Sequence, residues 1–292
     1  MEAHLSPREL AAALGVSESS IKRWVDGGEL AAVRTAGGHR RIPRTEAIRF
    51  SRQKRLVPSR PELLSLETAA IEDSGLDEQR RAAALHRALL DDDRGRAIGL
   101  LVSGYLAGQS VAALCDGPIR VALERIGEIW KHDARGILYE HRAVDTCLHA
   151  IAALRAALPA VPDGAPVALG AGGSDDPYLL PGLMCAAVLA EAGYRDVNLG
   201  PRTPVVTVAA AVTTYRPLLV WHTASTGGDD ETARELADLA SAIAAAGGAN
   251  PPRLVAGGRA LDPRKAPAGT VILAGMAQLE DFARGLVRRD TP

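Results

Sequence analysis

The chain of 292 residues is poor in aromatic side chains, which make up 3% of it, and it has only three cysteines. Ala, Leu and Val must therefore fill most of any core. Cys115, Cys147 and Cys185 are odd in number and widely spaced, which predicts neither disulfides nor a zinc site and favours a reducing cytoplasm. No basic segment followed by an apolar one opens the chain, and no run of about 18 apolar residues occurs. We therefore expect no signal peptide and no association with a membrane.

Charge is divided unevenly along the chain, although its net charge is only −1. Residues 1–60 have a net charge of +6 and the remainder has −7. A small basic module joined to an acidic body predicts an anionic partner, such as nucleic acid, for the first part alone. On charge alone, a solvated surface helix with many arginines is the alternative.

Residues 5–27 contain two short helical patterns joined by a tight turn. Ser6 and Glu9 have the spacing of a capping box, and Pro7 lies at the first helical position, where its missing N–H costs nothing. Gly15 ends the first pattern before the second begins. Two short helices around a glycine turn predict a helix-turn-helix.

The second of these helices has an apolar face and a polar face. Ile21, Trp24 and Val25 are spaced to pack on the first helix. The residues left facing outward suit contacts with phosphates and base edges; they are Ser19, Ser20, Lys22 and Arg23. We expect substitutions at Ser20 or Arg23 to alter sequence preference.

The segment AAVRTAGGHRRIP, residues 31–43, predicts a strand, a Gly-Gly turn and a second strand, which together form a wing. A cationic hairpin beside a recognition helix can clamp the flanking backbone or the minor groove. Loss of Arg40 or Arg41 should weaken binding to all sequences and lower the salt dependence by about one unit each. The candidate wing contacts are Arg34, Gly38, His39, Arg40 and Arg41.

A third, basic helical pattern, RTEAIRFSRQKR, follows at 44–55. This order closely resembles the DNA-binding domain of the MerR family, whose wing commonly carries a similar GGHRRY/F segment, with Ile42 here in the aromatic place. The resemblance implies a winged helix-turn-helix over residues 1–56 that binds double-stranded operator or promoter DNA as a dimer or tetramer. A helical hairpin that binds protein is the alternative.

The middle of the chain reads as a linker followed by helices. Residues 57–77 begin with prolines, serines and mixed charge, which is typical of a linker. Four segments with apolar residues at three- and four-residue spacing then predict a four-helix bundle over 78–160. These segments are 78–93, 96–108, 119–132 and 138–158.

Within the bundle, WKHDARGILYEH resembles the segment that caps the cofactor in the CarH/LitR group of cobalamin photoreceptors. The resemblance implies that Trp130 is a lid over adenosylcobalamin, that Ile137 is an apolar wall, and that Glu140 and His141 are polar contacts. His132 lies one position beyond the place of a histidine that can become a cobalt ligand in that group. A core tryptophan with a polar pair at a helix start is the alternative.

Residues 164–292 alternate between strand and helix patterns, which predicts a flavodoxin-like α/β domain with a parallel sheet. Ligands of such sheets lie outside the carboxyl ends of the strands. The predicted strands are 166–173, 196–200, 218–225, 253–258 and 270–275.

The order of the three parts is that of the CarH family, so its cobalamin-binding pattern can be traced here. The resemblance places Asp176 at an acidic position and Pro181 at a glycine, and it places Tyr178 where that family has its cobalt-ligating histidine. A neutral tyrosine phenol is a poor replacement for an imidazole on cobalt. The other cofactor contacts that the resemblance implies are Thr223 or, less closely, Ser225, together with Gly257 and Gly258.

No metal ligand is certain, because the position of the cobalt-ligating histidine is occupied by Tyr178. The remaining histidine candidates are His132 in the bundle and His222 in the α/β domain. His222 is expected near the strand ends, where a half-buried histidine with satisfied hydrogen bonds is the favoured interpretation. Tyr178 is therefore the residue on which the cofactor prediction depends.

The sequence as a whole predicts a cytoplasmic DNA-binding transcriptional regulator, by resemblance a repressor. Its C-terminal half would sense adenosylcobalamin, and light, and thereby control oligomerisation and DNA binding. Two alternatives keep the DNA-binding module: a cofactor-independent oligomeric regulator, and a sensor of another tetrapyrrole. A corrinoid carrier of an enzyme is the least favoured, because the histidine is missing and no catalytic constellation replaces it, so we expect no enzymatic activity.

Overall fold

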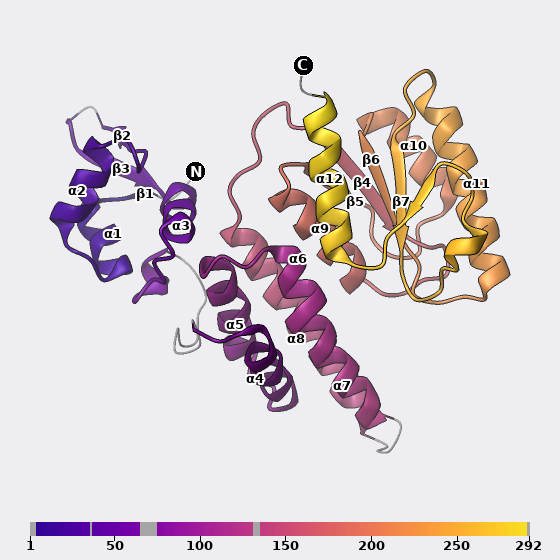
Figure 1. Cartoon of the computed structure of the whole chain (residues 1–292), viewed down its shortest axis with the longest axis horizontal. Helices are drawn as coiled ribbons and strands as arrows, with labels where there is room; N and C mark the ends of the chain where they lie inside the picture. Colours follow the sequence, from indigo (N-terminus) through magenta and orange to yellow (C-terminus); the bar gives the residue numbers. More distant parts are fainter. Residues whose placement is uncertain (1–3, 36, 65–74, 131–134, 291–292) are drawn as a thin grey trace. The chain divides into compact units, whose positions relative to one another are not determined.

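The computed structural model describes residues 4–35, 37–64, 75–130 and 135–290 (Figure 1). It divides into two compact units, Met1–Ala160 and Val161–Pro292. None of the helices in the described part of the chain combines the length and the apolar character that a membrane crossing requires.

The N-terminal module is a helix-turn-helix with a two-stranded wing, as its sequence predicts. A strand at His4–Leu5, which the sequence did not predict, pairs with the wing and makes a three-stranded sheet. The Ser6 hydroxyl accepts from the Glu9 N–H at 3.2 Å, and the Glu9 carboxylate accepts from the Ser6 N–H at 2.7 Å, which completes the capping box. Gly15 ends the first helix at φ 67°, a left-handed conformation that favours glycine. The elements are β1 (His4–Leu5), α1 (Pro7–Leu14), α2 (Glu18–Asp26), β2 (Val33–Arg34), β3 (Arg40–Pro43) and α3 (Arg44–Gln53).

The core of this module joins α2 and the sheet to α3. Ile21, Ile42 and Phe50 are fully buried, and the Trp24 ring packs on Phe50 with 5.0 Å between centroids. The strands lie in the order β1–β3–β2, so the wing strand β3 is central and is held on both sides. This arrangement fixes the wing on the same small core as the recognition helix.

The linker does not begin at residue 57 as its composition predicts. Residues Pro61–Leu64 form a short 3-10 helix, η1, that packs on α1, and Leu64 is fully buried. The Arg60 N–H donates to the Ala13 carbonyl at 3.1 Å. Prolines and serines at 57–61 therefore close the helix-turn-helix module, a tertiary contact that composition does not reveal.

The rest of the first unit holds four long helices that pack on one another. Helix α4 contacts α5, α7 and α8, and α8 also contacts α5 and α7. A short helix and a π turn containing Pro118 fill the connection predicted between 108 and 119, and the periodicity predicted neither of them. The elements are α4 (Glu78–Leu90), α5 (Arg94–Leu106), α6 (Val111–Leu114), η3 (Cys115–Ile119), α7 (Arg120–Trp130) and α8 (Gly136–Ala157).

The second unit is an α/β domain with a five-stranded, fully parallel sheet. Its strand order, β5–β4–β6–β7–β8, is the flavodoxin-like order that the sequence predicts. The strands are β4 (Val167–Gly172), β5 (Arg195–Asn198), β6 (Leu219–Thr223), β7 (Arg253–Gly257) and β8 (Thr270–Ile272). The helices are α9 (Leu180–Glu191), α10 (Val205–Tyr215), α11 (Asp229–Gly247) and α12 (Met276–Asp290).

Helices cover both faces of this sheet (Figure 1). Helices α10 and α11 pack together, and α9 and α12 pack together. Val220 of β6 belongs to the apolar core formed with α10 and α11, so its neighbour Trp221 faces the α9 side. The chain moves from β4 to β5 on one side and then to β6 on the other, which makes the carboxyl edge between β4 and β6 the switch point where such folds bind ligands.

Candidate nucleic-acid interface and carboxyl-edge site

The outward face of α2 carries the four residues predicted for DNA contact. Ser17 caps the helix by accepting from the Ser20 N–H at 3.1 Å, and its hydroxyl also contacts those of Ser19 and Ser20 at 2.8 and 2.9 Å. Lys22 forms an exposed i, i+4 pair with Glu18 at 2.8 Å. Arg23 is exposed and has no ion-pair partner among the residues that the structure describes.

The wing is a tight hairpin between β2 and β3. The Thr35 N–H donates to the His39 carbonyl at 2.9 Å, and the His39 N–H donates to the Thr35 hydroxyl at 3.2 Å. Gly38 has φ 77°, a conformation that the turn requires and that favours glycine. Arg34 and His39 are exposed, and neither has a side-chain partner in the described ranges.

Two other wing cations are engaged within the module. Arg40 forms an ion pair with Asp26, the last residue of α2, and Arg41 lies 3.9 Å from Glu9. Hydrogen bonding to the Ser6 N–H is the main reason that the pKa of Glu9 is lowered, so Glu9 is held as a carboxylate. The residues predicted to contact DNA thus lie together on α2 and the wing, but Arg40 is held in an ion pair with Asp26.

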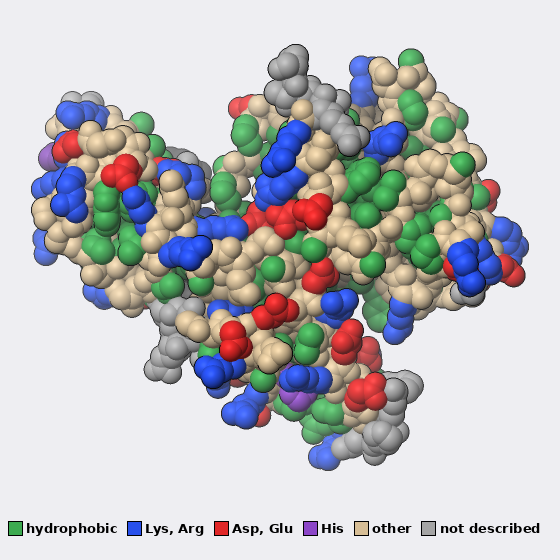
Figure 2. All heavy atoms as spheres, in the orientation of Figure 1, with side chains coloured by type: hydrophobic (Ala, Val, Ile, Leu, Met, Phe, Trp, Pro, Cys, Tyr) green, Lys and Arg blue, Asp and Glu red, His purple; other side chains and the backbone are tan. Residues whose placement is uncertain are grey.

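The basic residues of α3 are mostly occupied inside the unit. Arg49 bonds Glu46 at 2.6 Å, Lys54 pairs with Glu29, and the Arg52 guanidinium lies 3.9 Å from the centroid of Tyr105. Figure 2 shows Lys and Arg side chains on the visible face of this module. The exposed cations without an ion-pair partner in the described residues include Arg23 on α2 and Arg34 on the wing.

At the carboxyl edge of the α/β sheet, Asp176 ties three loops together. It is 2% exposed, and its carboxylate accepts from the Tyr178 N–H at 3.0 Å and from the Ser225 N–H. Its carbonyl accepts from the Arg202 N–H at 3.0 Å. The loops after β4, β5 and β6 therefore converge on this residue, and hydrogen bonds to the backbone use both carboxylate oxygens.

A second carboxylate holds the same loop from α11. Glu235 accepts from the Ser174 N–H at 2.6 Å and from the Ser174 hydroxyl at 2.5 Å. A side chain at Gly173 would come within 3.1 Å of Glu235, so glycine permits this close approach. Sequence analysis missed both Ser174 and Glu235, because a single glutamate within a charged helix carries no local signal.

His222 lies beneath this loop, on the α10–α11 side of the sheet. It is 4% exposed, and its Nε2 has no hydrogen-bond partner in the described part of the chain, so the prediction of a half-buried, satisfied histidine is wrong. Burial lowers its pKa, although the charges of Glu235 and Asp176 oppose this effect. The ring is therefore a neutral imidazole, buried near the carboxylates of Glu235 and Asp176.

The opposite side of the same strand end also holds polar atoms without partners. Trp221 Nε1 and Thr223 Oγ1 are buried and make no hydrogen bond within the described ranges. Trp221 lies over Gly170, where an added Cβ would come 1.9 Å from the indole ring. Gly258 has φ 137°, and a Cβ there would lie 2.0 Å from the Ala224 carbonyl oxygen, so this glycine lets the loops after β6 and β7 meet.

Tyr178 stands on the surface of the carboxyl-edge loop rather than inside it. It is 36% exposed, and the Arg259 guanidinium lies 5.9 Å from its ring centroid. Arg259 also donates to the Ser225 carbonyl at 2.8 Å. Pro181 lies in the first turn of α9, where proline is well tolerated.

The residues predicted to cap a cofactor lie around the start of α8. Ile137 is 54% exposed, Glu140 is half-buried and His141 is exposed. Trp130 is the last residue of α7, its side chain is not among those described, and His132 lies outside the described residues. The predicted capping role of this segment stays a prediction.

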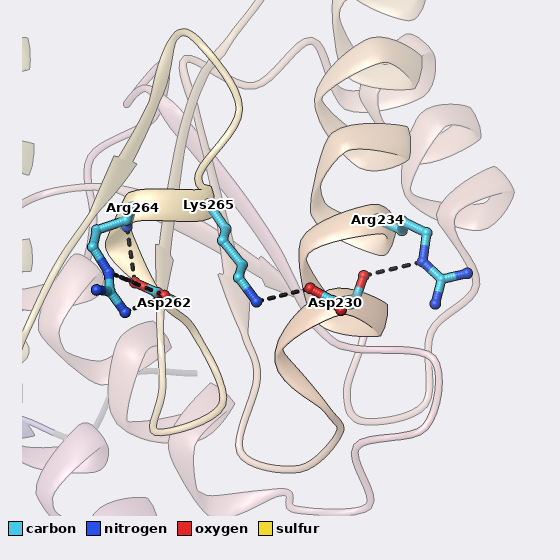
Figure 3. A network of polar contacts seen from close by, with 5 residues as sticks. All are labelled: Asp230, Arg234, Asp262, Arg264 and Lys265. Carbon is cyan, nitrogen blue, oxygen red and sulfur yellow. Dashed lines mark hydrogen bonds and ion pairs between the residues drawn. The ribbon is translucent and has the colours of Figure 1, made fainter.

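A surface network joins the segment before β8 to the start of α11 (Figure 3). Lys265 bonds Asp230 at 2.7 Å, and Arg234 Nε donates to the Asp230 carbonyl at 3.1 Å. Hydrogen bonds from Arg264 lower the pKa of Asp262 to about 2. In the ranges that the structure describes, no three His, Cys, Asp or Glu residues gather as a metal site.

Comparisons with known proteins agree with this architecture. Residues 5–55 match the family model of a helix-turn-helix domain. A search of curated proteins gives no match.

Three solved structures resemble the chain. The monomethylamine corrinoid protein of Methanosarcina barkeri has 14% identity and a TM-score of 0.56, covering 72% of this chain and 100% of that one. The methanol:cobalamin methyltransferase complex MtaBC from the same organism has 16% identity and a TM-score of 0.39, covering 93% of each chain. A cobalamin-binding protein from Desulfitobacterium hafniense DCB-2 has 18% identity and a TM-score of 0.37, covering 72% of this chain and 98% of that one.

The first of these likenesses shows a shared fold, whereas the other two TM-scores are too low to support an argument. Because the second unit is less than half of the chain, the match over 72% extends into the first unit. The chain thus joins an N-terminal helix-turn-helix domain to a fold that a corrinoid protein shares.

The resemblance noted in the sequence implies a corrinoid whose cobalt is held by the loop after β4, and the residues of the carboxyl edge can be compared with that expectation. The loop after β4 offers the exposed phenol of Tyr178 and no imidazole, and His222 lies behind Gly173, with its Cε1 3.7 Å from where a Cβ would be. Asp176 is already used by backbone donors. These residues do not fit a corrinoid whose cobalt takes a ligand from this loop.

Proposed function

We propose that this protein is a DNA-binding transcriptional regulator with an N-terminal DNA-binding domain and a C-terminal sensory domain. One observation carries the proposal: Arg23 on α2, and Arg34 and His39 on the wing, are exposed side chains without partners in the described residues, and they belong to a domain that matches the helix-turn-helix family. Cations presented from two adjacent elements suit the phosphates on either side of a groove.

In this proposal α2 enters the major groove and the wing contacts the flanking backbone or minor groove. Ser19, Ser20 and Arg23 lie on the outward face of α2, where they would reach base edges. A module this small makes few phosphate contacts, so useful affinity requires linked copies. The regulator therefore acts as a dimer or a tetramer, on an operator with repeated half-sites.

The experiment is selection of duplexes from a randomised library by the full-length protein. The proposal expects enrichment of a repeated half-site whose centres are separated by about one helical turn or a multiple of it. Variants Arg23→Ala and Ser20→Ala should enrich altered half-sites, whereas Lys22→Ala should lower the yield without altering the sequence. Failure to enrich any sequence at low salt would overturn the proposal.

The sensory part of the proposal concerns the switch point between β4 and β6. Two buried polar atoms there, Trp221 Nε1 and Thr223 Oγ1, have no partner in the described part of the chain. They support a site for a polar ligand, or for the polar part of a larger one, on the α9 side of the sheet. We propose a ligand of the cobalamin type that receives no cobalt ligand from the loop bearing Tyr178.

Adenosylcobalamin is the first ligand to test, in the dark and after illumination. Co-elution of the corrinoid with the protein, together with a change in oligomeric state, would support this assignment. A colourless protein that stays oligomeric and binds DNA would instead favour a cofactor-independent regulator. A bilin or haem absorption band would identify a different tetrapyrrole.

We further propose that the chain acts in the cytoplasm as a repressor and is not itself an enzyme. The support is the DNA-binding face, which a corrinoid carrier of an enzyme does not need. A reporter gene placed behind the selected operator should be silenced when the protein is expressed. Methyl transfer from a corrinoid bound to this protein would contradict the non-enzymatic part.

A further inference from the structure

The wing presents two arginines at directly opposing positions. In the register of β2 and β3, Arg34 lies opposite Arg40, and Val33 lies opposite Arg41. Residues directly opposite one another in an antiparallel pair have side chains on the same face, and like charges in such a pair destabilise it. The hairpin therefore needs a negative charge that compensates one of the two arginines.

Asp26 of α2 provides this negative charge. It is the last residue of α2, where a carboxylate interacts unfavourably with the negative end of the helix dipole unless a cation compensates it. The Arg40 guanidinium bonds this carboxylate. The side chain of Arg40 is 24% exposed, whereas that of Asp26 is 59% exposed, so the arginine is the member packed against the module.

We infer that Arg40 is a positioning residue, which joins the wing to the end of the recognition helix, and that it is not a phosphate contact. Arg34 is then the cation that this face of the wing offers to DNA. The inference rests on the proposed function and revises the role expected for Arg40 from the sequence. It concerns the spacing between α2 and the wing, which decides whether both can reach their places on one duplex.

Substitution of Asp26 separates the two roles of Arg40 most sharply. Asp26→Asn removes a negative charge from the DNA-facing module, and electrostatics alone therefore predicts tighter binding with a steeper salt dependence. If Arg40 is a positioning residue, the same change breaks its ion pair and releases the wing. Binding then weakens by roughly 5-fold, as expected for a surface ion pair of good geometry. The two models thus predict effects of opposite sign.

Glu18→Gln is the matched control. It removes one negative charge from the same helix, through an exposed pair with Lys22 that does not touch the wing. Binding of full-length proteins to a fluorescent mixed-sequence duplex of about 30 bp is measured by anisotropy at several salt concentrations between about 50 and about 200 mM. Thermal unfolding confirms that each variant is folded.

Weaker binding by Asp26→Asn with an unchanged salt slope would support the positioning role of Arg40. In that case Glu18→Gln should bind as tightly as the natural protein or more tightly. Tighter binding by both variants would overturn the inference and leave the proposed function intact. If the natural protein itself does not bind at low salt, the proposed function fails and this inference fails with it.

Arg40→Gln and Arg34→Gln provide a second comparison that does not depend on Asp26. Loss of a phosphate contact lowers the magnitude of the salt slope by about one, and Arg34→Gln should do this. Arg40→Gln should weaken binding with little change of slope. A drop of about one in the slope for Arg40→Gln would show that Arg40 contacts phosphate and would overturn the inference.

Discussion

Two aspartates hold the two functional regions of this molecule in place, and they do so in opposite ways. Asp26 lies on the surface and bonds a guanidinium, whereas Asp176 is buried and bonds backbone N–H groups. Exposed pairs are screened by salt and water, so changes around Asp26 should be small and graded. A buried carboxylate leaves unpaired donors when it is removed, so changes at Asp176 should be large and insensitive to salt.

The difference follows from what each region must do. The DNA-binding face keeps cations in water until an anionic partner arrives, and most of its arginines can change partner. The carboxyl edge instead ties its loops together through buried carboxylates. His222 on one face of the sheet, and Trp221 and Thr223 on the other, each have a buried atom without a partner in the described residues.

The largest expected effect is that of Asp176→Ala. It leaves the Tyr178 and Ser225 N–H groups without their acceptor, and we expect the second unit to lose about 3 kcal/mol of stability. Asp175→Ala, at the exposed neighbouring position, should change stability by less than about 0.5 kcal/mol. Chemical unfolding followed by tryptophan fluorescence measures both variants. Equal stabilities for the two would remove the contrast between buried and exposed aspartates.

Gly170→Ala should be the next largest change. Its new methyl group would lie 1.9 Å from the Trp221 ring, and overpacking of this kind destabilises by about 1 to 3 kcal/mol. Gly285→Ala in α12 of the same unit meets nothing within 4 Å and should stabilise by up to about 1 kcal/mol through helix propensity. Thermal unfolding should show shifts of opposite sign, and a tolerated Gly170→Ala would mean that the indole moves freely.

The acid response of the second unit should depend on His222. Burial lowers its pKa below the ordinary 6.5, so below that pH the unfolded chain takes up a proton before the folded domain does. The stabilisation is therefore full above pH 6.5 and declines as the pH falls toward the lowered folded-state pKa, by at most about 1.4 kcal/mol per pH unit.

Unfolding of His222→Gln at several pH values tests this response, and its stability should fall less on acidification than that of the natural protein. His86 is the matched control, because burial and the charge of Arg125 also lower its pKa, but in the first unit. His86→Gln should leave the acid response of the α/β transition unchanged. An undiminished pH dependence in His222→Gln would show that other groups produce it.

The smallest effect is expected in the exposed network of Figure 3. Lys265→Ala removes the ion pair with Asp230, which is fully exposed, so the unfolding temperature should not change measurably. A clear loss would show that this network, rather than the buried carboxylates, holds the loops before β8. Asp230→Asn should behave in the same way.

Local patterns predicted most of the fold. Capping residues at Ser6 and Glu9, the Gly-Gly turn of the wing and the alternation after residue 164 all act over a few neighbouring residues, and the structure has each of these elements. The short helix and the π turn before α7 escaped prediction because one turn of helix is too short for periodicity to reveal. The later start of the linker escaped prediction because only the packing of Pro61–Leu64 on α1 reveals it.

The sites were predicted less completely, for the same physical reason. A sequence shows that Arg40 and Asp176 are charged, but their partners come from distant positions in the chain. Glu235 lies 61 residues from Ser174, so nothing local links the two. Motif spacing, charge and the alternation of strand and helix patterns therefore identified the regions, whereas the role of each residue within them required the tertiary structure.

The most direct test of the account is the salt dependence of DNA binding by the full-length protein. We predict that its affinity for a mixed-sequence duplex falls linearly with the logarithm of salt concentration, and that Arg34→Gln reduces the magnitude of that slope by about one. An absence of binding at about 50 mM salt, or an affinity that does not change with salt, would contradict the assignment of the N-terminal module as a DNA-binding domain.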